Sequence, residues 1–369
     1  MDHATGPTVA KRKGTEDADT NEAKKLRPDD ANDVIPSSVM TASNSTLQLR
    51  PVLADEYVRK VVTVPVYVGR IVNRKETSRL VRWLSDSIPL GELQHLKRVR
   101  STATGMQVIL RPVKQDDSDG AKTVEDVLKA DPTLTEGLSE DAIVVHVPRY
   151  VPLTRCQFEA SNAIWPTQFH EDKLIARILG DKFFTTKDKE EMEGYMRMAL
   201  GAARKSLVTA FTCVGVVVIN QDTSTPLVIA TRDASHPLKH AVMVAVDMVA
   251  RQQGGGVWPV TAEDVLCKVT PQEQEVNKKA PYLCTGYDFY ITHEPCTMCA
   301  MALVHSRVRR VFYGCPTSHG ALGSLRKLHV QPALNHHFQV WCGLLEQECA
   351  ALNDSTQEDC ATSTEVNNS

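Results

Sequence analysis

The sequence predicts an α/β protein with two folded domains: a smaller α+β domain comes first, and a larger three-layer α/β/α domain follows. A chain of 369 residues exceeds the usual length of one domain, and its 42% of hydrophobic residues suffice for more than one core. Strand-like and helix-like apolar patterns alternate along both halves of the chain. Residues 1–47 and 354–369 are polar instead, so we expect disorder in both terminal segments.

Composition argues against several classes of protein. The net charge of −3 provides no overall attraction to nucleic acid or to an anionic membrane. No apolar run approaches the roughly 20 residues that span a bilayer, and the N-terminus is polar where a secretory signal is apolar. We therefore expect a soluble intracellular protein with no membrane partner, in which closely spaced cysteines indicate metal binding or redox chemistry.

Two basic clusters lie within the N-terminal arm. Residues 11–13 (KRK) and 24–27 (KKLR) are separated by ten residues, which is the layout of a bipartite nuclear import signal. On this interpretation the protein occupies the nucleus and the cytoplasm. The alternative is that these charges only keep the arm solvated or contact RNA.

Residues 48–150 carry the patterns of the smaller domain. Strands and amphipathic helices follow one another in a β-α-β-β-α-β order, which is the ferredoxin-like layout. The expected elements are a strand within 61–72, a helix across 80–88, strands at 93–99 and 106–113, a helix at 124–128 and a strand at 142–147.

Positive charge is concentrated in this smaller domain. Between Arg59 and Lys114 the sequence has twelve Lys or Arg and three Asp or Glu, an excess of nine positive charges. A solvated mixed surface is one explanation; the other is a face that contacts phosphates, if the second domain acts on nucleic acid. The candidate RNA contacts are Arg70, Arg74, Lys97, Arg98, Arg100 and Arg111.

Residues 151–189 are predicted to form an irregular connector, and the larger domain is expected at 190–353. Strands alternate with helices in this second half, which indicates a three-layer α/β/α domain. The expected elements are a helix at 190–205, strands at 207–220 and 226–231, a helix at 240–249, a polar insertion at 252–285, a strand at 288–292, a helix at 296–305, a strand at 308–313, and a last strand and helix within 338–352.

A Pro-Cys-x-x-Cys motif stands at the start of one predicted helix. Its thiolates, Cys296 and Cys299, lie one turn apart, where free N–H groups and the helix dipole favour anionic sulfur. Zinc suits this geometry, and His240 at the start of the preceding helix is the obvious third ligand, which leaves one coordination position open. A Cys-x-x-Cys motif alone also occurs in redox proteins, so the two-helix arrangement strengthens the metal interpretation.

Zinc-dependent nucleobase deaminases have an H-x-E motif followed by P-C-x-x-C. This chain retains His240 and has Val242 in place of the glutamate. The similarity extends over about residues 190–352. The segments 291–308 (ITHEPCTMCAMALVHSRV), 334–336 (LNH) and 346–352 (EQECAAL) resemble the tRNA adenosine deaminase branch of the cytidine and deoxycytidylate deaminase superfamily.

Within that branch, a valine at the glutamate position, an added N-terminal domain and a long insertion are similar to one family. This family comprises the non-catalytic subunits of the eukaryotic heterodimeric tRNA wobble adenosine deaminase. The resemblance implies a partner subunit that retains H-x-E and converts adenosine to inosine at the first anticodon position. It also implies zinc bound by His240, Cys296 and Cys299, and a role of this chain in holding tRNA.

Chemistry gives an independent reason why Val242 matters. The glutamate of these enzymes takes a proton from zinc-bound water and delivers protons to the ring nitrogen and the departing ammonia, a contribution on the order of 10²–10⁴-fold. Valine transfers no protons, and neither Glu294 nor Asp247 is well placed to replace the missing acid. We therefore expect a chain that is inactive by itself. The alternatives are an independent deaminase with a substituted base and an RNA-binding scaffold without zinc.

Overall fold

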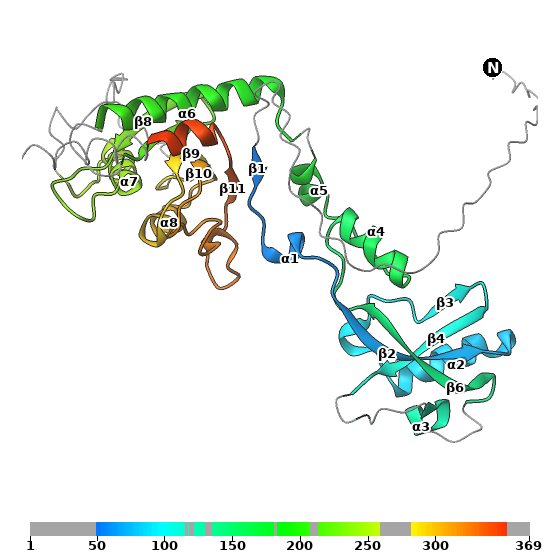
Figure 1. Ribbon diagram of the computed structural model, residues 1–369. Coiled ribbons are helices and arrows are strands. Elements are labelled where there is room, and N and C mark those ends of the chain that lie inside the picture. Colours follow the sequence, from blue (N-terminus) through cyan, green and yellow to red (C-terminus); the bar gives the residue numbers. More distant parts are fainter. Residues whose placement is uncertain are drawn as a thin grey trace, which may run out of the picture. The chain divides into compact units, whose positions relative to one another are not determined.

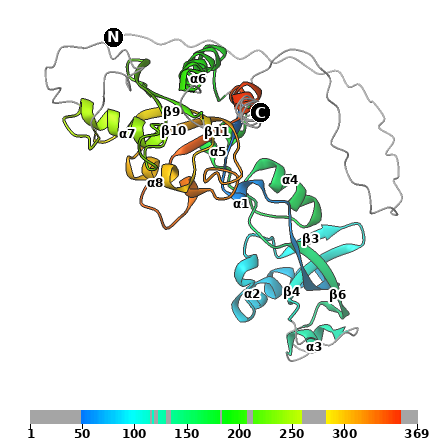
Figure 2. The ribbon, with the colours of Figure 1, turned by 60° about the vertical axis from the view of Figure 1, so that its left-hand side comes forward.

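A computed structural model describes residues 49–114, 117, 122–129, 135–180, 183–206, 213–258 and 282–352 of the chain (Figures 1 and 2). The expected terminal arms, the basic clusters at 11–13 and 24–27, and most of the insertion at 252–285 lie outside these residues. None of the described helices combines the length and the apolar character that crossing a bilayer requires.

The smaller domain is a five-stranded antiparallel sheet with two helices. Its strand order is β3-β4-β2-β6-β5. Apart from the two-residue strand β5, this confirms the predicted ferredoxin-like order. The elements are β2 (Thr63–Ile71), α2 (Thr77–Ser87), β3 (Val99–Thr102), β4 (Gly105–Pro112), β5 (Lys122–Thr123), α3 (Val124–Leu128) and β6 (Leu138–Pro148).

The strand predicted at residues 93–99 is wrong. A short 3-10 helix, η2 (Gly91–Leu93), occupies the start of this segment, and β3 begins only at its last residue. Leu90, Leu93 and Leu96 recur at every third position and are all buried on one face of the sheet. Their apolar pattern therefore belongs to a turn that covers the core, and not to a strand within it.

Strands β2 and β4 of the smaller domain are covered on both faces of the sheet. Side chains of α2 and α3 pack on one face. On the other face, Val66 and Ile109 lie in one cluster with the leucines around η2 and with the fully buried Trp165. The Trp165 indole N–H donates to the main-chain oxygen of Lys97 at 2.6 Å. Because β2 and β4 are buried on both sides, their side chains are not available to stack on nucleic-acid bases, whereas Ile143 and Val144 of β6 are 48% and 53% exposed.

Two short helices replace much of the irregular connector predicted at 151–189. The first, α4 (Arg155–Ile164), begins with a capping box, in which Thr154 and Gln157 accept each other's main-chain N–H groups. The second is α5 (Lys173–Leu179). Each helix buries only one residue, although the apolar residues of α5, Leu174, Ile175, Ile178 and Leu179, do recur at helical spacing.

The larger domain has the predicted three layers. In its sheet β9, β10 and β11 are parallel, and β7 is antiparallel to both β8 and β9, so β8 runs in the same direction as β9. Helices α7 and α8 cover one face, and α6 with the helical residues 346–352 covers the other. The elements are α6 (Thr186–Ser206), β7 (Gly215–Asn220), β8 (Thr225–Thr231), α7 (Ala241–Gln252), β9 (Tyr287–His293), α8 (Thr297–His305), β10 (Arg310–Cys315) and β11 (Gln339–Cys342).

One short strand differs from the predicted domain boundary. β1 (Arg50–Pro51) was expected in the smaller domain, yet it pairs antiparallel with β11 at the edge of the larger sheet. Arg50 also forms an ion pair with Glu346 at 2.7 Å. Helix α1 (Asp55–Val58) follows and leads to β2. Two paired residues have no measurable periodicity, so the sequence pattern cannot reveal such a strand.

Gly215, at the start of β7, is enclosed by α6. A Cβ atom added there would lie 1.9 Å from the main-chain oxygen of Ala199. We expect Gly215→Ala to lower the free energy of unfolding by about 1–3 kcal/mol, because backbone cannot move aside without repacking. Gly194→Ala, in α6, is the control: its added Cβ meets nothing within 4 Å, so it should stabilise by about 0.5–1 kcal/mol. Urea denaturation measures the free energy of unfolding of both variants. An unchanged value for Gly215→Ala would contradict this packing.

Candidate metal centre

Two helices begin at the same edge of the larger sheet. Because β8 and β9 run in one direction, α7 after β8 and α8 after β9 both start beyond the carboxyl ends of these strands. His240 is the N-cap residue of α7, and Cys296 is the N-cap residue of α8. Neither side chain forms a capping hydrogen bond with its own helix. Both lie instead in one cluster with Cys299.

The structure brings the three predicted ligands together. His240 Nδ1 lies 3.6 Å from the Sγ atom of Cys296 and 3.6 Å from that of Cys299. Tetrahedral zinc, with bonds of about 2.0–2.1 Å to nitrogen and about 2.3 Å to sulfur, separates these atoms by about 3.6 Å. The donor set and its spacing therefore fit zinc. Among the residues that the structure describes, no other group of three His, Cys, Asp or Glu side chains is gathered as candidate metal ligands.

The two thiols differ in acidity because they are hydrogen-bonded to each other. The Cys299 thiol donates to Cys296, which lowers the pKa of Cys296 to about 5 although burial opposes this shift. Donating that hydrogen bond, together with burial, raises the pKa of Cys299. Main-chain N–H groups of Cys299 and Met243, in the first turns of α8 and α7, also favour negative charge on the sulfur atoms. The site is thus prepared to carry anionic sulfur.

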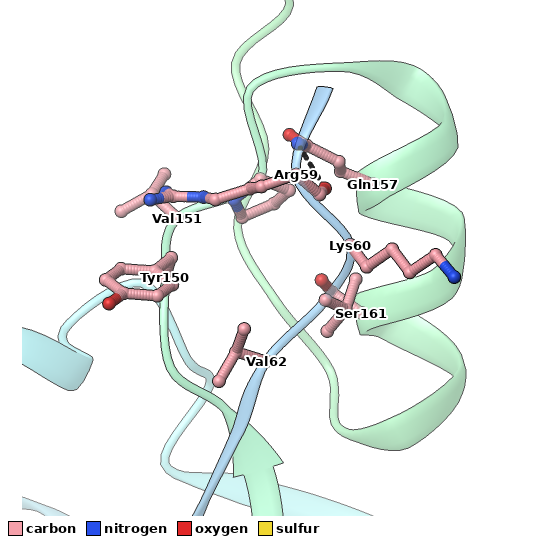
Figure 3. A pocket seen from close by; sticks show the side chains of 9 residues that line it. Arg59, Lys60, Val62, Tyr150, Val151, Gln157 and Ser161 are labelled. Atoms are coloured by element: carbon pink, nitrogen blue, oxygen red, sulfur yellow. Dashed lines mark hydrogen bonds between the residues drawn. The ribbon is translucent and has the colours of Figure 1, made fainter. Parts of the chain in front are cut away.

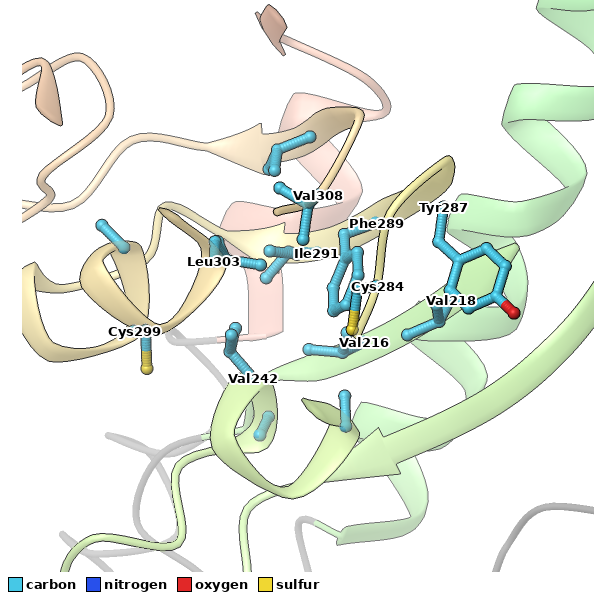
Figure 4. Close-up of a cluster of buried hydrophobic side chains, with 14 of the residues drawn as sticks. Val216, Val218, Val242, Cys284, Tyr287, Phe289, Ile291, Cys299, Leu303 and Val308 are labelled. Carbon is cyan, nitrogen blue, oxygen red and sulfur yellow. The ribbon is translucent and has the colours of Figure 1, made fainter. Parts of the chain in front are cut away.

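Val242 is buried beside this centre. Its side chain is 2% exposed and lies in the apolar cluster that also contains Cys299 and Leu303 (Figure 4). In the H-x-E motif this position supplies the carboxylate that moves protons. Here the chain presents two methyl groups in an apolar environment.

The two acids considered as replacements have other partners. Glu294 is 3% exposed, and its carboxylate accepts three main-chain N–H groups and one hydroxyl group from residues 317–324. Asp247 accepts the main-chain N–H of Val257 at 2.6 Å and pairs with Arg251 at 3.0 Å. Both carboxylates hold loops or helix ends, which supports the expectation that neither replaces the missing glutamate.

The six candidate RNA contacts fall into two groups. Arg70, Arg74 and Lys97 are exposed. Arg98 is half-buried and donates to the main-chain oxygens of residues 88, 109 and 110 at 2.8 to 3.1 Å. Burial lowers the pKa of Arg98 to about 10. Its guanidinium group therefore satisfies carbonyls of its own domain.

Arg100 and Arg111 are held inside the smaller domain in the same way. Arg100 donates to Gln107 at 2.8 Å and lies 4.2 Å from the centre of the Trp165 ring. Arg111 forms an ion pair with Asp117 at 2.7 Å, and both side chains are mostly buried. These arginines stabilise the domain, and the charge count along the sequence does not distinguish them from the exposed ones.

An aromatic and basic patch escaped the sequence analysis. Where the chain enters and leaves the smaller domain, the Arg59 guanidinium lies 3.9 Å from the centre of the Tyr150 ring, and the Arg149 guanidinium lies 5.2 Å from it. Gln157 donates to the main-chain oxygen of Arg59 (Figure 3). The cavity beside them measures about 10 Å³, the space of about one water molecule. It is a surface feature, and only tertiary structure pairs residues so distant in sequence.

Family models match both domains. The cytidine and deoxycytidylate deaminase zinc-binding region matches residues 189–315. The N-terminal domain of the tRNA-specific adenosine deaminase TAD3 matches residues 64–165. The second match ends at Trp165, the residue that completes the core of the smaller domain.

Whole proteins similar to this chain carry related names. The chain is 40% identical over 321 residues to the probable inactive tRNA-specific adenosine deaminase-like protein 3 of Danio rerio, which covers 84% of this chain and 95% of the relative. It is 25% identical over 376 residues to the tRNA-specific adenosine deaminase TAD3 of Arabidopsis thaliana, over 78% of this chain and 92% of the relative. It is 29% identical over 202 residues to the tRNA-specific adenosine deaminase subunit tad3 of Schizosaccharomyces pombe, over 53% and 58%. With both of its domains matched, the chain belongs to the TAD3 family of tRNA-specific adenosine deaminase-like proteins.

Proposed function

We propose that this chain is the non-catalytic, zinc-binding subunit of a heterodimeric tRNA adenosine(34)-to-inosine deaminase. One observation carries the proposal: the ligand set of His240, Cys296 and Cys299 is complete, whereas the proton-transfer position is a buried Val242. The relative in fission yeast is named a subunit, and the relative in zebrafish is named probably inactive. A partner that retains H-x-E supplies the proton transfer.

The residues of this chain account for binding a metal but not for turnover. Zinc, when bound, acts as a Lewis acid and lowers the pKa of water. Deamination also needs a side chain that moves protons between solvent, the ring nitrogen and the leaving ammonia. Val242 has no titratable atom, and the carboxylates of Glu294 and Asp247 are engaged in other hydrogen bonds.

The smaller domain is proposed to contribute to tRNA binding through exposed side chains. Arg70, Arg74 and Lys97 are free to reach phosphates. Strands β2 and β4 are covered on both faces, so stacking of bases on these two strands is not part of the proposal. Contacts to the phosphate backbone of a folded tRNA depend on charge and shape, and they need no such platform.

Reconstitution tests the division of labour. We expect the isolated chain to form no inosine at position 34 of tRNA, and a mixture with a deaminase chain that retains H-x-E to form it. Val242→Glu should leave the isolated chain inactive and lower its Tm, because burying a carboxylate among apolar side chains costs more than the roughly 1–3 kcal/mol for a neutral amide. Val242→Gln is the uncharged control. Inosine formation by the isolated chain at the rate of the mixture would refute the proposal.

Metal analysis tests the zinc site. Purified chain should contain about one zinc ion, and Cys299→Ala or His240→Ala should lose it, as measured by mass spectrometry of the metal content. Cys213→Ala is the matched control, because this thiol is buried on the opposite face of the sheet. Zinc that remains after removal of Cys299 would show that the metal binds elsewhere.

Salt dependence of tRNA binding separates the two groups of arginines. Charge reversal at Arg70, Arg74 and Lys97 should weaken binding and reduce the slope of log Kd against log salt by about one for each lost phosphate contact. Arg98→Lys retains the charge and should leave this slope unchanged while lowering Tm, because the single nitrogen of lysine cannot reach the three carbonyls that Nε and Nη2 of the guanidinium group bind. An unchanged slope in the triple variant would show that these three residues do not contact phosphates.

A further inference from the structure

A loop of residues 316–330, here called the metal-side loop, is attached directly to the segment that carries Cys296. Cys296 forms an isolated β-bridge with Gly320, and the Ala321 N–H donates to the main-chain oxygen of Pro295 at 2.8 Å. Two residues before Cys296, the buried Glu294 accepts four hydrogen bonds from this loop. The metal ligand and the loop are therefore joined as one hydrogen-bonded unit.

Gly320 lies so close to the Glu294 carboxylate that no side chain larger than hydrogen fits there. A Cβ atom at Gly320 would lie 2.0 Å from the carboxyl carbon of Glu294. Ala321 and Leu322 are fully buried in the apolar cluster of α7 and α8. The loop is thus packed against the metal-binding helices and is not a free surface loop.

The other end of the same loop holds the residues that lead into the smaller domain. We call residues 50–55 the strap. His329 is 1% exposed, and its Nε2 lies 2.8 Å from the main-chain oxygen of Val52, which can only accept, so Nε2 carries the proton. Burial lowers the pKa of His329 to about 4, so the ring stays neutral near neutral pH. Lys327 donates to the main-chain oxygen of Leu53 at 2.9 Å.

Only part of the bonding by Lys327 is protected from solvent. Its ion pair with Asp55 measures 2.6 Å, but the Asp55 side chain is 88% exposed, so solvent and salt screen this contact. The bond to the Leu53 carbonyl lies closer to the sheet, where Val52 donates to Val340 at 2.8 Å beside β1. The main chain of the strap is therefore held by side chains of the metal-side loop and by the main chain of β11.

We infer that the metal centre of this chain anchors the strap, with Glu294, Lys327 and His329 as positioning residues between them. Metal ligation fixes Cys296, the hydrogen bonds of Glu294 carry this order into the metal-side loop, and Lys327 and His329 hold the strap through which the smaller domain is connected. This gives a chain without the catalytic glutamate a reason to retain its metal. The inference rests on the proposed function only in requiring that zinc is bound.

Linkage makes the coupling measurable in both directions. If zinc binding stabilises the seated strap, a seated strap must strengthen zinc binding by the same free energy. Couplings of this kind usually amount to at least about fivefold. The readouts are hydrogen exchange of the full-length chain at residues 50–55 and 320–325, and the zinc affinity measured by equilibrium competition with a colorimetric chelator.

We expect removal of zinc to raise exchange at the strap and at the metal-side loop. Lys327→Met should increase exchange at the strap with zinc still bound, and should weaken zinc binding by about fivefold or more. Arg326→Met is the matched control: this neighbouring side chain is exposed, and it donates to the main-chain oxygen of the adjacent Leu325. Glu294→Gln weakens the hydrogen bonds between Glu294 and the metal-side loop. If that variant does not fold, Lys327→Met alone tests the inference.

Unchanged zinc affinity and unchanged strap exchange in Lys327→Met would overturn the inference, as would strap exchange that does not respond to zinc removal. Failure of the proposed metal site has a different signature, because a chain that contains no zinc when purified has nothing to release. The two outcomes are therefore distinguished by metal content alone.

Discussion

The shared direction of β8 and β9, which lie on either side of β7, brings the metal ligands together. β8 and β9 run the same way, so the helices that follow them begin at one edge of the sheet, and their first turns meet. Free N–H groups at both helix N-termini favour anionic sulfur, and His240 comes from the opposite helix. If β8 ran the other way, α7 would start at the far edge and the ligand set would be divided.

This arrangement separates metal binding from proton transfer. Ligation needs three side chains at the two helix starts, whereas proton transfer needs one further side chain on α7. A valine at that one position leaves the ligands in place and packs into the apolar cluster behind them. A fold of this kind can therefore keep its metal after losing catalysis, and in this chain the hydrogen bonds of Glu294 link the same centre to a loop outside it.

The smaller domain shows how one residue type serves two purposes. Arg98 and Arg111 bind carbonyl and carboxylate oxygens within the domain, whereas Arg70 and Arg74 extend into solvent. The excess of positive charge in this part of the chain is therefore partly internal. Trp165, which lies beyond the predicted domain boundary, closes the sheet face that would otherwise be open.

The sequence by itself determined the larger α/β/α domain, the order of strands and helices in the smaller domain, the three metal-ligand candidates and the missing glutamate. These follow from apolar periodicity and from short motifs, because both are local properties of the chain. Only the tertiary structure decided that residues 91–96 form a covering turn, that β1 belongs to the larger sheet, and that Glu294 and Lys327 connect the metal-side loop at its two ends. Such features depend on hydrogen bonds between residues far apart in sequence, and a local pattern contains no information about which distant carbonyl or N–H group a side chain will meet.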